Sequence, residues 1–266
     1  MTVSTTRPLA VVTGASSGIG YELAKQFAKH GFDLVITSTG SSIDDAAQAF
    51  KQLGAQVETV QADLATYDGV EVLYSQIQKM GRPVDAIAIN AGVGVGGEFT
   101  KTNLQEELNL IELNVASTVH LAKRVVKDMV DRGSGKILFT SSIVSQMPSP
   151  FQAVYAASKA FVHSFSEAIR NELKDTGVTV TALMPGATET NFFHRAGLDD
   201  TKVGAAKKDD PAEVAKQGFE ALMAGKDSIL AESLVTKIGG AIGSILPDTV
   251  TSEMNRKLNE PGSANK

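Results

Sequence analysis

Residues 9–20 read Leu-Ala-Val-Val-Thr-Gly-Ala-Ser-Ser-Gly-Ile-Gly, an apolar run that leads directly into a loop with three glycines. The run Leu9–Thr13 predicts a buried strand, and the pattern that begins at Ile19 predicts a helix that starts inside the loop. Because glycine has no Cβ, the loop permits a tight turn and a close approach of a ligand to the backbone. The free N–H groups and positive dipole end of a helix N-terminus attract a phosphate. This stretch therefore predicts a site for a phosphate-containing ligand.

Beyond this stretch, short apolar runs alternate with longer amphipathic ones. Further strands are predicted at Asp33–Thr37, Gln56–Gln61, Asp85–Ile89, Lys136–Thr140 and Val178–Leu183. Helices are predicted at Ile19–His30, Ile43–Leu53, Thr66–Met80 and Val154–Leu173, and one long helix is predicted over much of Leu104–Val130. Strands of about five residues separated by helices indicate βαβ units. We therefore expect the α/β class, as a doubly wound, Rossmann-like parallel sheet with helices on both faces.

The length of 266 residues lies within the range of one α/β domain, and an apolar content of 42% is ordinary for a globular protein. We expect a single dinucleotide-binding and catalytic domain over 1–266, with its core at about 8–192. The substrate loop and a helical C-terminal region are expected at about 187–260. There, a helix to about Ala224, a last strand at Asp227–Glu232 and a frayed tail after Glu260 are predicted.

Composition excludes several classes of function. The formal charge of −5 argues against nucleic acid as a partner, and the absence of cysteine removes disulfides and thiolate metal sites. The four histidines are scattered without a metal-binding spacing, so no metal is expected. No apolar stretch approaches the roughly 20 residues that span a bilayer, and the first residues do not resemble a signal peptide. We therefore expect a cytoplasmic protein.

The glycine loop also matches G-x-S-x-G over residues 14–18, the nucleophile elbow of hydrolases, with Ser16 as the nucleophile. In that fold the oxyanion site needs an N–H group from a loop after an earlier strand, but only one predicted strand precedes Ser16. A catalytic triad would have to use His163 or His194. The loop lacks the GK[ST] of a nucleoside-triphosphate site. The hydrolase hypothesis is therefore the weaker one.

A second group of residues suggests acid–base chemistry. Tyr155 and Lys159 are four residues apart at the start of a predicted helix, which puts both side chains on one face. An ammonium group beside a phenol favours the phenolate, so we expect Lys159 to lower the pKa of Tyr155 from about 10. Ser142 ends the fifth predicted strand, at the sheet edge where ligands bind in such folds. Such a tyrosine, beside a hydroxyl that holds a substrate oxygen, can act as a general acid or base.

Together, these residues resemble the classical short-chain dehydrogenases/reductases. The matching pieces are TGASSGIG at 13–20, Asp63-Leu64, Asn90-Ala91-Gly92, Asn114, Ser142, Tyr155 with Lys159, and Pro185-Gly186. They occur in the order and spacing of that family over about residues 8–192. The resemblance implies an oxidoreductase that transfers a hydride between a nicotinamide cofactor and a carbonyl or alcohol substrate.

The resemblance also implies a role for each matching residue. Tyr155 is expected to shuttle the proton, Ser142 to orient the carbonyl, Lys159 to hold the nicotinamide ribose, and Asn114 to support a proton relay. Ser141 is one residue too far from Tyr155 and is expected to pack at the strand end. The expected cofactor contacts are Gly14, Ser16, Ser17, Gly18, Ile19, Gly20, Ser38, Thr39, Asp63, Leu64, Asn90, Ala91, Gly92, Tyr155, Lys159, Pro185, Gly186, Thr188 and Thr190.

The end of the second predicted strand bears on the choice of cofactor. In dinucleotide folds, an acid about 20 residues beyond the glycines binds the ribose 2′-hydroxyl of NAD. The segment Thr37–Ser42 contains no acid, and Asp33 lies at the opposite end of the strand. The segment has no lysine or arginine either, but its hydroxyls and that of Ser17 can bind a phosphate. We therefore predict NADP, with NAD as the alternative.

Several large apolar residues lie in the segments expected to contact the substrate, 143–154 and 188–208, and suggest an apolar substrate. They are Ile143, Val144, Met147, Phe151, Phe192 and Phe193. Near the C-terminus, a second apolar set recurs at helical spacing: Leu234, Val235, Ile238, Ile242, Ile245 and Leu246. This extension is expected to pack on the protein's own core or on a second copy, with a membrane-surface helix as the alternative.

Two functions remain open at this point. The first is an NADP-preferring carbonyl reductase or alcohol dehydrogenase, which by resemblance forms a homo-oligomer, a dimer or tetramer, through the helices at 104–130 and 154–173. The second is a dinucleotide-binding regulator without turnover. A regulator needs the glycine loop but has no use for the joint set of Asn114, Ser142, Tyr155 and Lys159, so the set favours the enzyme.

Overall fold

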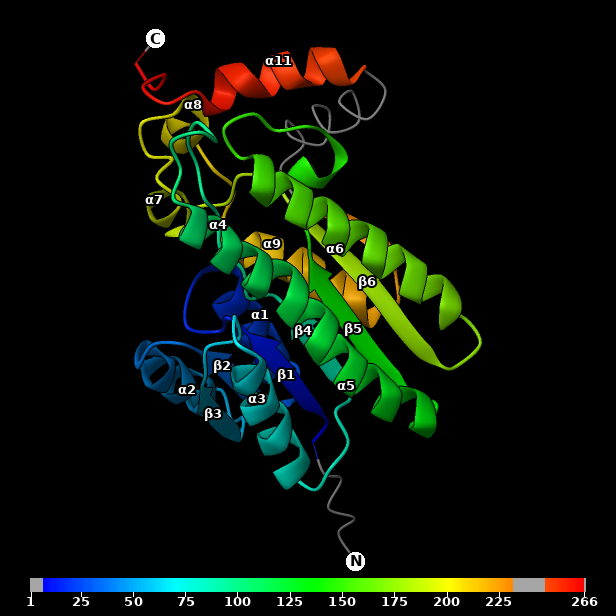
Figure 1. Cartoon of the computed structure of the whole chain (residues 1–266). Coiled ribbons are helices and arrows are strands. Elements are labelled where there is room, and N and C mark those ends of the chain that lie inside the picture. Colours follow the sequence, from blue (N-terminus) through cyan, green and yellow to red (C-terminus); the bar gives the residue numbers. More distant parts are fainter. Residues whose placement is uncertain (1–6, 232–246, 266) are drawn as a thin grey trace, which may run out of the picture.

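Seven parallel strands form one sheet in the computed structural model, which describes residues 7–231 and 247–265 (Figure 1). The strands are β1 (Leu9–Thr13), β2 (Asp33–Ser38), β3 (Val57–Gln61), β4 (Ala86–Ile89), β5 (Gly135–Thr140), β6 (Val178–Pro185) and β7 (Ser228–Ala231). Their order in the sheet is β3-β2-β1-β4-β5-β6-β7, so the chain reverses its direction of winding between β1 and β4. The predicted doubly wound parallel sheet is confirmed.

Helices cover both faces of this sheet. The long ones are α1 (Gly18–Lys29), α2 (Ser42–Gln52), α3 (Tyr67–Lys79), α5 (Ser117–Arg132), α6 (Ala153–Glu172) and α9 (Pro211–Met223). Along β1, side chains alternate between the two faces: Ala10 and Val12 pack with α1, α2 and α9, whereas Leu9 and Val11 pack with α3, α5 and α6. Because both faces are buried, the strand is apolar at nearly every position, as parallel sheets require.

The long helix predicted over Leu104–Val130 is interrupted, which corrects the sequence-based expectation. The chain forms α4 (Leu104–Ile111), a π-helical segment η1 (Glu112–Ala116) and then α5. Local hydroxyls support the wider turn: Ser117 Oγ donates to the Leu113 carbonyl at 2.5 Å, and Thr118 Oγ1 donates to the Asn114 carbonyl at 2.9 Å. Such side-chain bonds to the carbonyl four residues back bend helices, and π segments are often found at functional sites.

The C-terminal part contains the short helices α7 (Phe192–Arg195) and α8 (Lys202–Ala205), followed by α9 and β7, and ends with α11 (Asp248–Asn259). The expected frayed tail is wrong: Ser263 is buried, and its hydroxyl accepts a hydrogen bond from the Lys202 N–H at 3.0 Å. The predicted apolar stripe from Leu234 to Leu246 lies outside the described residues. Among the residues that are described, no helix is both long and apolar enough to cross a bilayer.

Candidate active site

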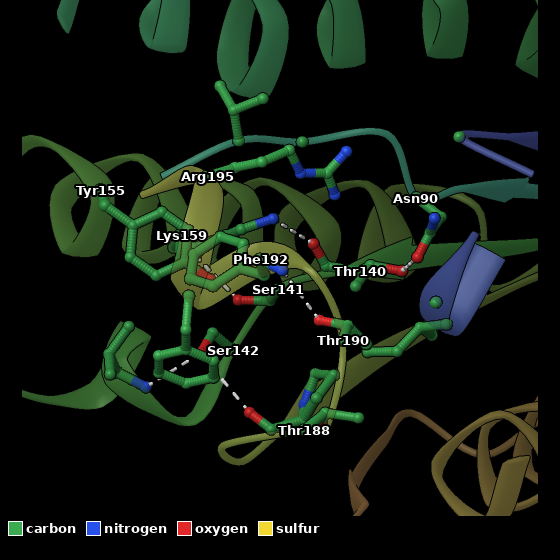
Figure 2. Close-up of a pocket in the computed structure, with 18 of the residues that line it drawn as sticks. Asn90, Thr140, Ser141, Ser142, Tyr155, Lys159, Thr188, Thr190, Phe192 and Arg195 are labelled. Atoms are coloured by element: carbon green, nitrogen blue, oxygen red, sulfur yellow. Dashed lines mark hydrogen bonds between the residues drawn. The ribbon is translucent and has the colours of Figure 1, made fainter. Parts of the chain in front are cut away.

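A cavity of about 490 Å³ opens at the carboxyl ends of the strands (Figure 2). Most of the residues predicted as cofactor contacts line it, namely Gly14, Ser16, Ser17, Gly18, Ile19, Gly20, Ser38, Thr39, Leu64, Asn90, Ala91, Gly92, Tyr155, Lys159, Pro185, Gly186, Thr188 and Thr190. Ser142 lines it as well, so three of the four predicted catalytic residues meet the cofactor residues in one place. Asp63 and Asn114 lie outside this lining. The Asp63 carboxylate accepts a hydrogen bond from the Ala65 N–H at 3.0 Å, and its contact with the cofactor stays a prediction.

The glycine loop between β1 and α1 forms one wall of the cavity. Gly14 and Gly18 have φ angles of +67° and +57°, which residues with a Cβ rarely adopt. A Cβ on Gly20 would lie 2.2 Å from the Gly14 carbonyl oxygen, so this backbone packing requires glycine. Ser17 is the N-cap of α1 but makes no side-chain capping bond, which leaves the first N–H groups of the helix to a ligand. This cradle fits the pyrophosphate of a dinucleotide.

Asn90 connects the strand ends beneath the cavity. Its Nδ2 donates to the Thr13 carbonyl at 3.0 Å, and its Oδ1 accepts from Thr140 Oγ1 at 3.1 Å. The Asn90 and Ala91 N–H groups both donate to Thr13 Oγ1 at 2.9 Å. The side chain therefore joins β1, β4 and β5 at the point where the winding of the sheet reverses.

Tyr155 and Lys159 project from the first turns of α6 into the same cavity, where Figure 2 shows them beside Ser142. They are buried, with 9% and 4% of their surfaces exposed. The Lys159 amine donates to the Thr140 carbonyl at 2.9 Å and lies 5.9 Å from the centre of the Tyr155 ring. The spacing of four residues thus places both groups on one helix face, as predicted.

The expected fall in the pKa of Tyr155 is wrong for this arrangement. Burial raises the pKa of Tyr155 to about 12, although the hydrogen bond with Ser142 acts in the opposite direction. Burial also lowers the pKa of Lys159 to about 8. The physical reason is the same for both groups, because removal from water disfavours whichever form is charged. The phenol is therefore protonated at neutral pH.

Asn114 supports the site from behind the cavity wall. Its Oδ1 accepts from the Val93 N–H at 3.0 Å, and its Nδ2 donates to the Val93 carbonyl at 2.9 Å and to Ser158 Oγ at 3.0 Å. An ideal Cβ on Gly92 would lie 3.1 Å from Asn114 Oδ1 and 3.3 Å from Lys159 Nζ. The amide oxygen and the amine thus approach the same glycine from two helices.

The two adjacent serines after β5 have different surroundings. Ser142 is the N-cap of the short 3-10 helix η2 (Ile143–Gln146), two residues beyond the end of β5 rather than in the strand. Its hydroxyl lies 3.4 Å from the Pro185 carbonyl, to which it donates. The hydroxyl of Ser141 instead donates to the Lys159 carbonyl at 2.8 Å. Ser141 therefore fastens α6 to the sheet, as its predicted packing role requires.

Comparison with known proteins identifies the family. A model of the short chain dehydrogenases matches residues 8–200. The chain belongs to the short-chain dehydrogenase/reductase family. It is therefore an NAD(P)-dependent oxidoreductase, and its seven-stranded Rossmann-like sheet is the fold of that family.

Several relatives of this short-chain dehydrogenase/reductase span most of the chain. It is 29% identical to the ketoacyl reductase HetN of Nostoc sp., over 90% of this chain and 85% of the relative. A short-chain dehydrogenase from Sphingobium yanoikuyae in complex with NADPH superposes with a TM-score of 0.80 at 29% identity, over 88% of this chain and 92% of that one. A 3-oxoacyl-[acyl-carrier protein] reductase from Brucella melitensis in complex with NAD superposes with a TM-score of 0.74 at 26% identity, over 86% of this chain and 97% of that one.

The charges around the cavity of this short-chain dehydrogenase/reductase are few. Asp33 lies at the amino end of β2, where its carboxylate accepts from Arg82 at 2.9 Å, so it is far along the strand from the cavity edge. Among the described residues that line the cavity there is no aspartate or glutamate, and Lys159 and Arg195 are the cationic ones. Ser17, Ser38 and Thr39 present hydroxyls at the wall formed by the end of β2.

The hydrolase alternative has no geometric support in this member of the family. Ser16 lines the cavity, but no described hydrogen bond joins it to a histidine. His194 is paired with Asp199 at 2.7 Å, and His163 lies on α6 with a buried Nδ1 that has no hydrogen-bond partner.

The substrate side of the cavity contains residues that the sequence analysis found and others that it missed. Ile143, Val144, Met147, Phe192 and Phe193 line it as predicted, whereas Phe151 does not. Five residues of α11 line it without having been predicted: Thr251, Met254, Asn255, Leu258 and Asn259. A signal was present, since Met254 and Leu258 are four residues apart and follow Pro247-Asp248, a common start of a helix.

The packing of Gly20 leads to a testable prediction. We expect Gly20→Ala to weaken binding of NADPH at least tenfold, because the added methyl group must displace the Gly14 carbonyl and with it the phosphate cradle. Titration of NADPH fluorescence measures the dissociation constant. Gly40→Ala is the control, because a Cβ there meets only Ser42 Oγ at 3.8 Å. Equal affinities of both variants and the wild type would contradict the prediction.

Proposed function

We propose that this protein is a carbonyl reductase or alcohol dehydrogenase that prefers NADP(H), with Tyr155 as its general acid and base. The observation that carries the proposal is the position of the Tyr155 phenol, which is buried in the cavity with Ser142 and Lys159 and lies within the same lining as the glycine loop. Because burial keeps the phenol protonated at neutral pH, Tyr155 is in the acid form that carbonyl reduction requires.

Each residue of the site has a separate role in such a reaction. The reduced nicotinamide supplies the hydride that a carbonyl carbon accepts. Tyr155 gives its hydroxyl proton to the carbonyl oxygen, while the Ser142 hydroxyl holds that oxygen by a hydrogen bond. The Lys159 ammonium holds the cofactor ribose and stabilises the phenolate that remains. Asn114 keeps the turn before α5 in place and supports a proton relay toward Lys159.

Replacement of the phenol tests this role. We expect Tyr155→Phe to lower kcat for carbonyl reduction by about 10²–10⁴, the usual contribution of a general acid, while NADPH still binds. Steady-state kinetics and NADPH fluorescence measure the two properties. Tyr74→Phe is the control, because Tyr74 lies on the surface with its hydroxyl on Asp128 at 3.1 Å. Turnover unaffected by Tyr155→Phe would refute the role of Tyr155, whereas biological activity retained in this variant without turnover would favour the regulator hypothesis.

The pKa of Lys159 sets an expected pH dependence. Tyr155 keeps its proton up to a pH of about 12, whereas Lys159 loses its proton above about pH 8. The kcat/KM for reduction should therefore be constant below this value and fall roughly tenfold per pH unit above it. In Lys159→Arg the guanidinium stays charged, so its residual activity should lack this fall. A fall near pH 8 that persists in Lys159→Arg would assign the titration to another group.

The preference for NADP rests on the end of β2. The absence of an acid from the described lining removes the group that would repel a 2′-phosphate, and the hydroxyls of Ser17, Ser38 and Thr39 are placed to bind one. We expect Ser38→Asp to weaken NADPH binding at least tenfold and to leave NADH binding less affected. Ser38→Asn, which has the same shape without the charge, is the control. Tighter binding of NADH than of NADPH by the wild type would refute the preference.

We further infer a homodimer formed by α4 and α6, in a protein that we expect in the cytoplasm. Leu104, Leu108 and Ile111 share one exposed face of α4, and Phe161 is exposed on the adjacent α6. Exposed apolar side chains on two neighbouring helices are typical of an association surface. Leu108→Lys should therefore yield a monomer in sedimentation analysis, whereas Val72→Lys on α3, also exposed, should not. A monomeric wild type would exclude the dimer.

A further inference from the structure

The C-terminal helix α11 is attached to the loop that connects Ser142 with Tyr155. Asn255 Nδ2 donates to the Pro148 carbonyl at 2.9 Å. Asn259 Nδ2 donates to Ser149 Oγ at 2.9 Å and to the Pro150 carbonyl at 3.2 Å. Asn259 and Ser149 are both buried, so their hydrogen bond is protected from water. The position of α11 is thereby coupled to the loop between the two reacting side chains.

The same loop contains a backbone conformation that its surroundings hold in place. Phe151 has a φ of +65°, the one positive value for a non-glycine residue among those described. The Phe151 carbonyl accepts from the Gly97 N–H at 2.8 Å, and the Arg256 guanidinium of α11 lies 5.1 Å from the centre of the Phe151 ring. Strained residues of this kind persist where several contacts define them.

The residues after α11 are fastened to the segment around α8, of which Val203 lines the cavity. The Gly262 N–H donates to Asp200 Oδ2 and the Ala264 N–H donates to the Asp200 carbonyl, both at 2.9 Å. Ser263 accepts from the Lys202 N–H at the start of α8. Figure 1 shows α11 lying across the end of the molecule at which α7 and α8 also lie. The helix therefore spans the two loops that form the substrate side.

Two apolar side chains of α11 face the cavity and are largely exposed among the described residues. Met254 and Leu258 line the cavity, yet 52% and 45% of their surfaces are exposed. The same cavity is also lined by Ile143, Val144, Met147 and Val203. The groups that can hold a carbonyl oxygen, Ser142 and Tyr155, project from η2 and α6, so an apolar region adjoins the polar one.

We propose that α11 is a wall of the substrate pocket and selects carbonyl compounds with an extended apolar chain, which lies against Met254 and Leu258. This inference rests on the proposed reductase function and names its substrate class. Ser142, Tyr155, Met254 and Leu258 line one cavity, so a carbonyl held at the two hydroxyls leaves its chain in the same space as the two apolar side chains, whose exposed surface the chain would cover. Each methylene buried there strengthens binding about fourfold.

A series of methyl ketones tests the proposal: butanone, hexanone, octanone and decanone, each reduced with NADPH. For the wild type, kcat/KM should rise with chain length. Leu258→Ala and Met254→Ala should lower the ratio of kcat/KM for decanone to that for butanone by about tenfold, because they remove the surface that the longer chain buries. Val250→Ala is the matched control, because Val250 is exposed on the same helix, one turn before Met254, but does not line the cavity.

A binding measurement separates recognition from chemistry. In the Tyr155→Phe background, titration of the NADPH complex with decanone, followed by NADPH fluorescence, should show a dissociation constant that Leu258→Ala raises about tenfold and Val250→Ala leaves unchanged. A decanone-to-butanone ratio that Leu258→Ala and Met254→Ala do not alter, or a wild type indifferent to chain length, would overturn the role of α11. Absence of turnover with every ketone and aldehyde tested would instead overturn the proposed function.

Discussion

The side-chain amide of Asn90 links the strands at the point where the winding of the sheet reverses. The shape of the cavity depends on these hydrogen bonds. Through Thr13 and Thr140 it joins β1 to β5, and the Thr140 carbonyl in turn accepts from the Lys159 amine. These groups are buried or nearly so, and a buried partner left without its hydrogen bond costs about 1–3 kcal/mol. One chain of hydrogen bonds therefore sets both the distance between the strand ends and the position of the catalytic amine.

The π-helical segment η1 places a second side chain, Asn114, that fixes the surroundings of the cavity by hydrogen bonds. The π turn contains one additional residue, so it rotates the side chains that follow it about the helix axis. In an uninterrupted helix from Leu104 to Arg132, the side chains before and after this segment would therefore point in different relative directions. With the segment in place, the Asn114 side chain makes paired bonds to the Val93 backbone and a third bond to Ser158 on α6. The loop after β4 and the catalytic helix are thereby held by one side chain.

Burial, rather than the proximity of opposite charge, dominates the electrostatics of the site. It raises the pKa of Tyr155 and lowers the pKa of Lys159, so both groups are moved toward their neutral forms. In the proposed reaction, the protonated phenol is the form from which reduction of a carbonyl starts. The reverse reaction needs the phenolate, which this environment disfavours.

The glycine loop, the apolar strands and the spacing of Ser142, Tyr155 and Lys159 are local patterns. From them the sequence alone determined the doubly wound sheet, the family and most of the residues on the cofactor side of the cavity. These features follow from backbone sterics and helix periodicity, which act over a few residues. The π segment at Asn114, the raised pKa of Tyr155 and the place of α11 above the loop of Phe151 were decided only by the tertiary structure. Each depends on groups distant in the chain, whose desolvation and hydrogen bonds exist only once the layers have packed.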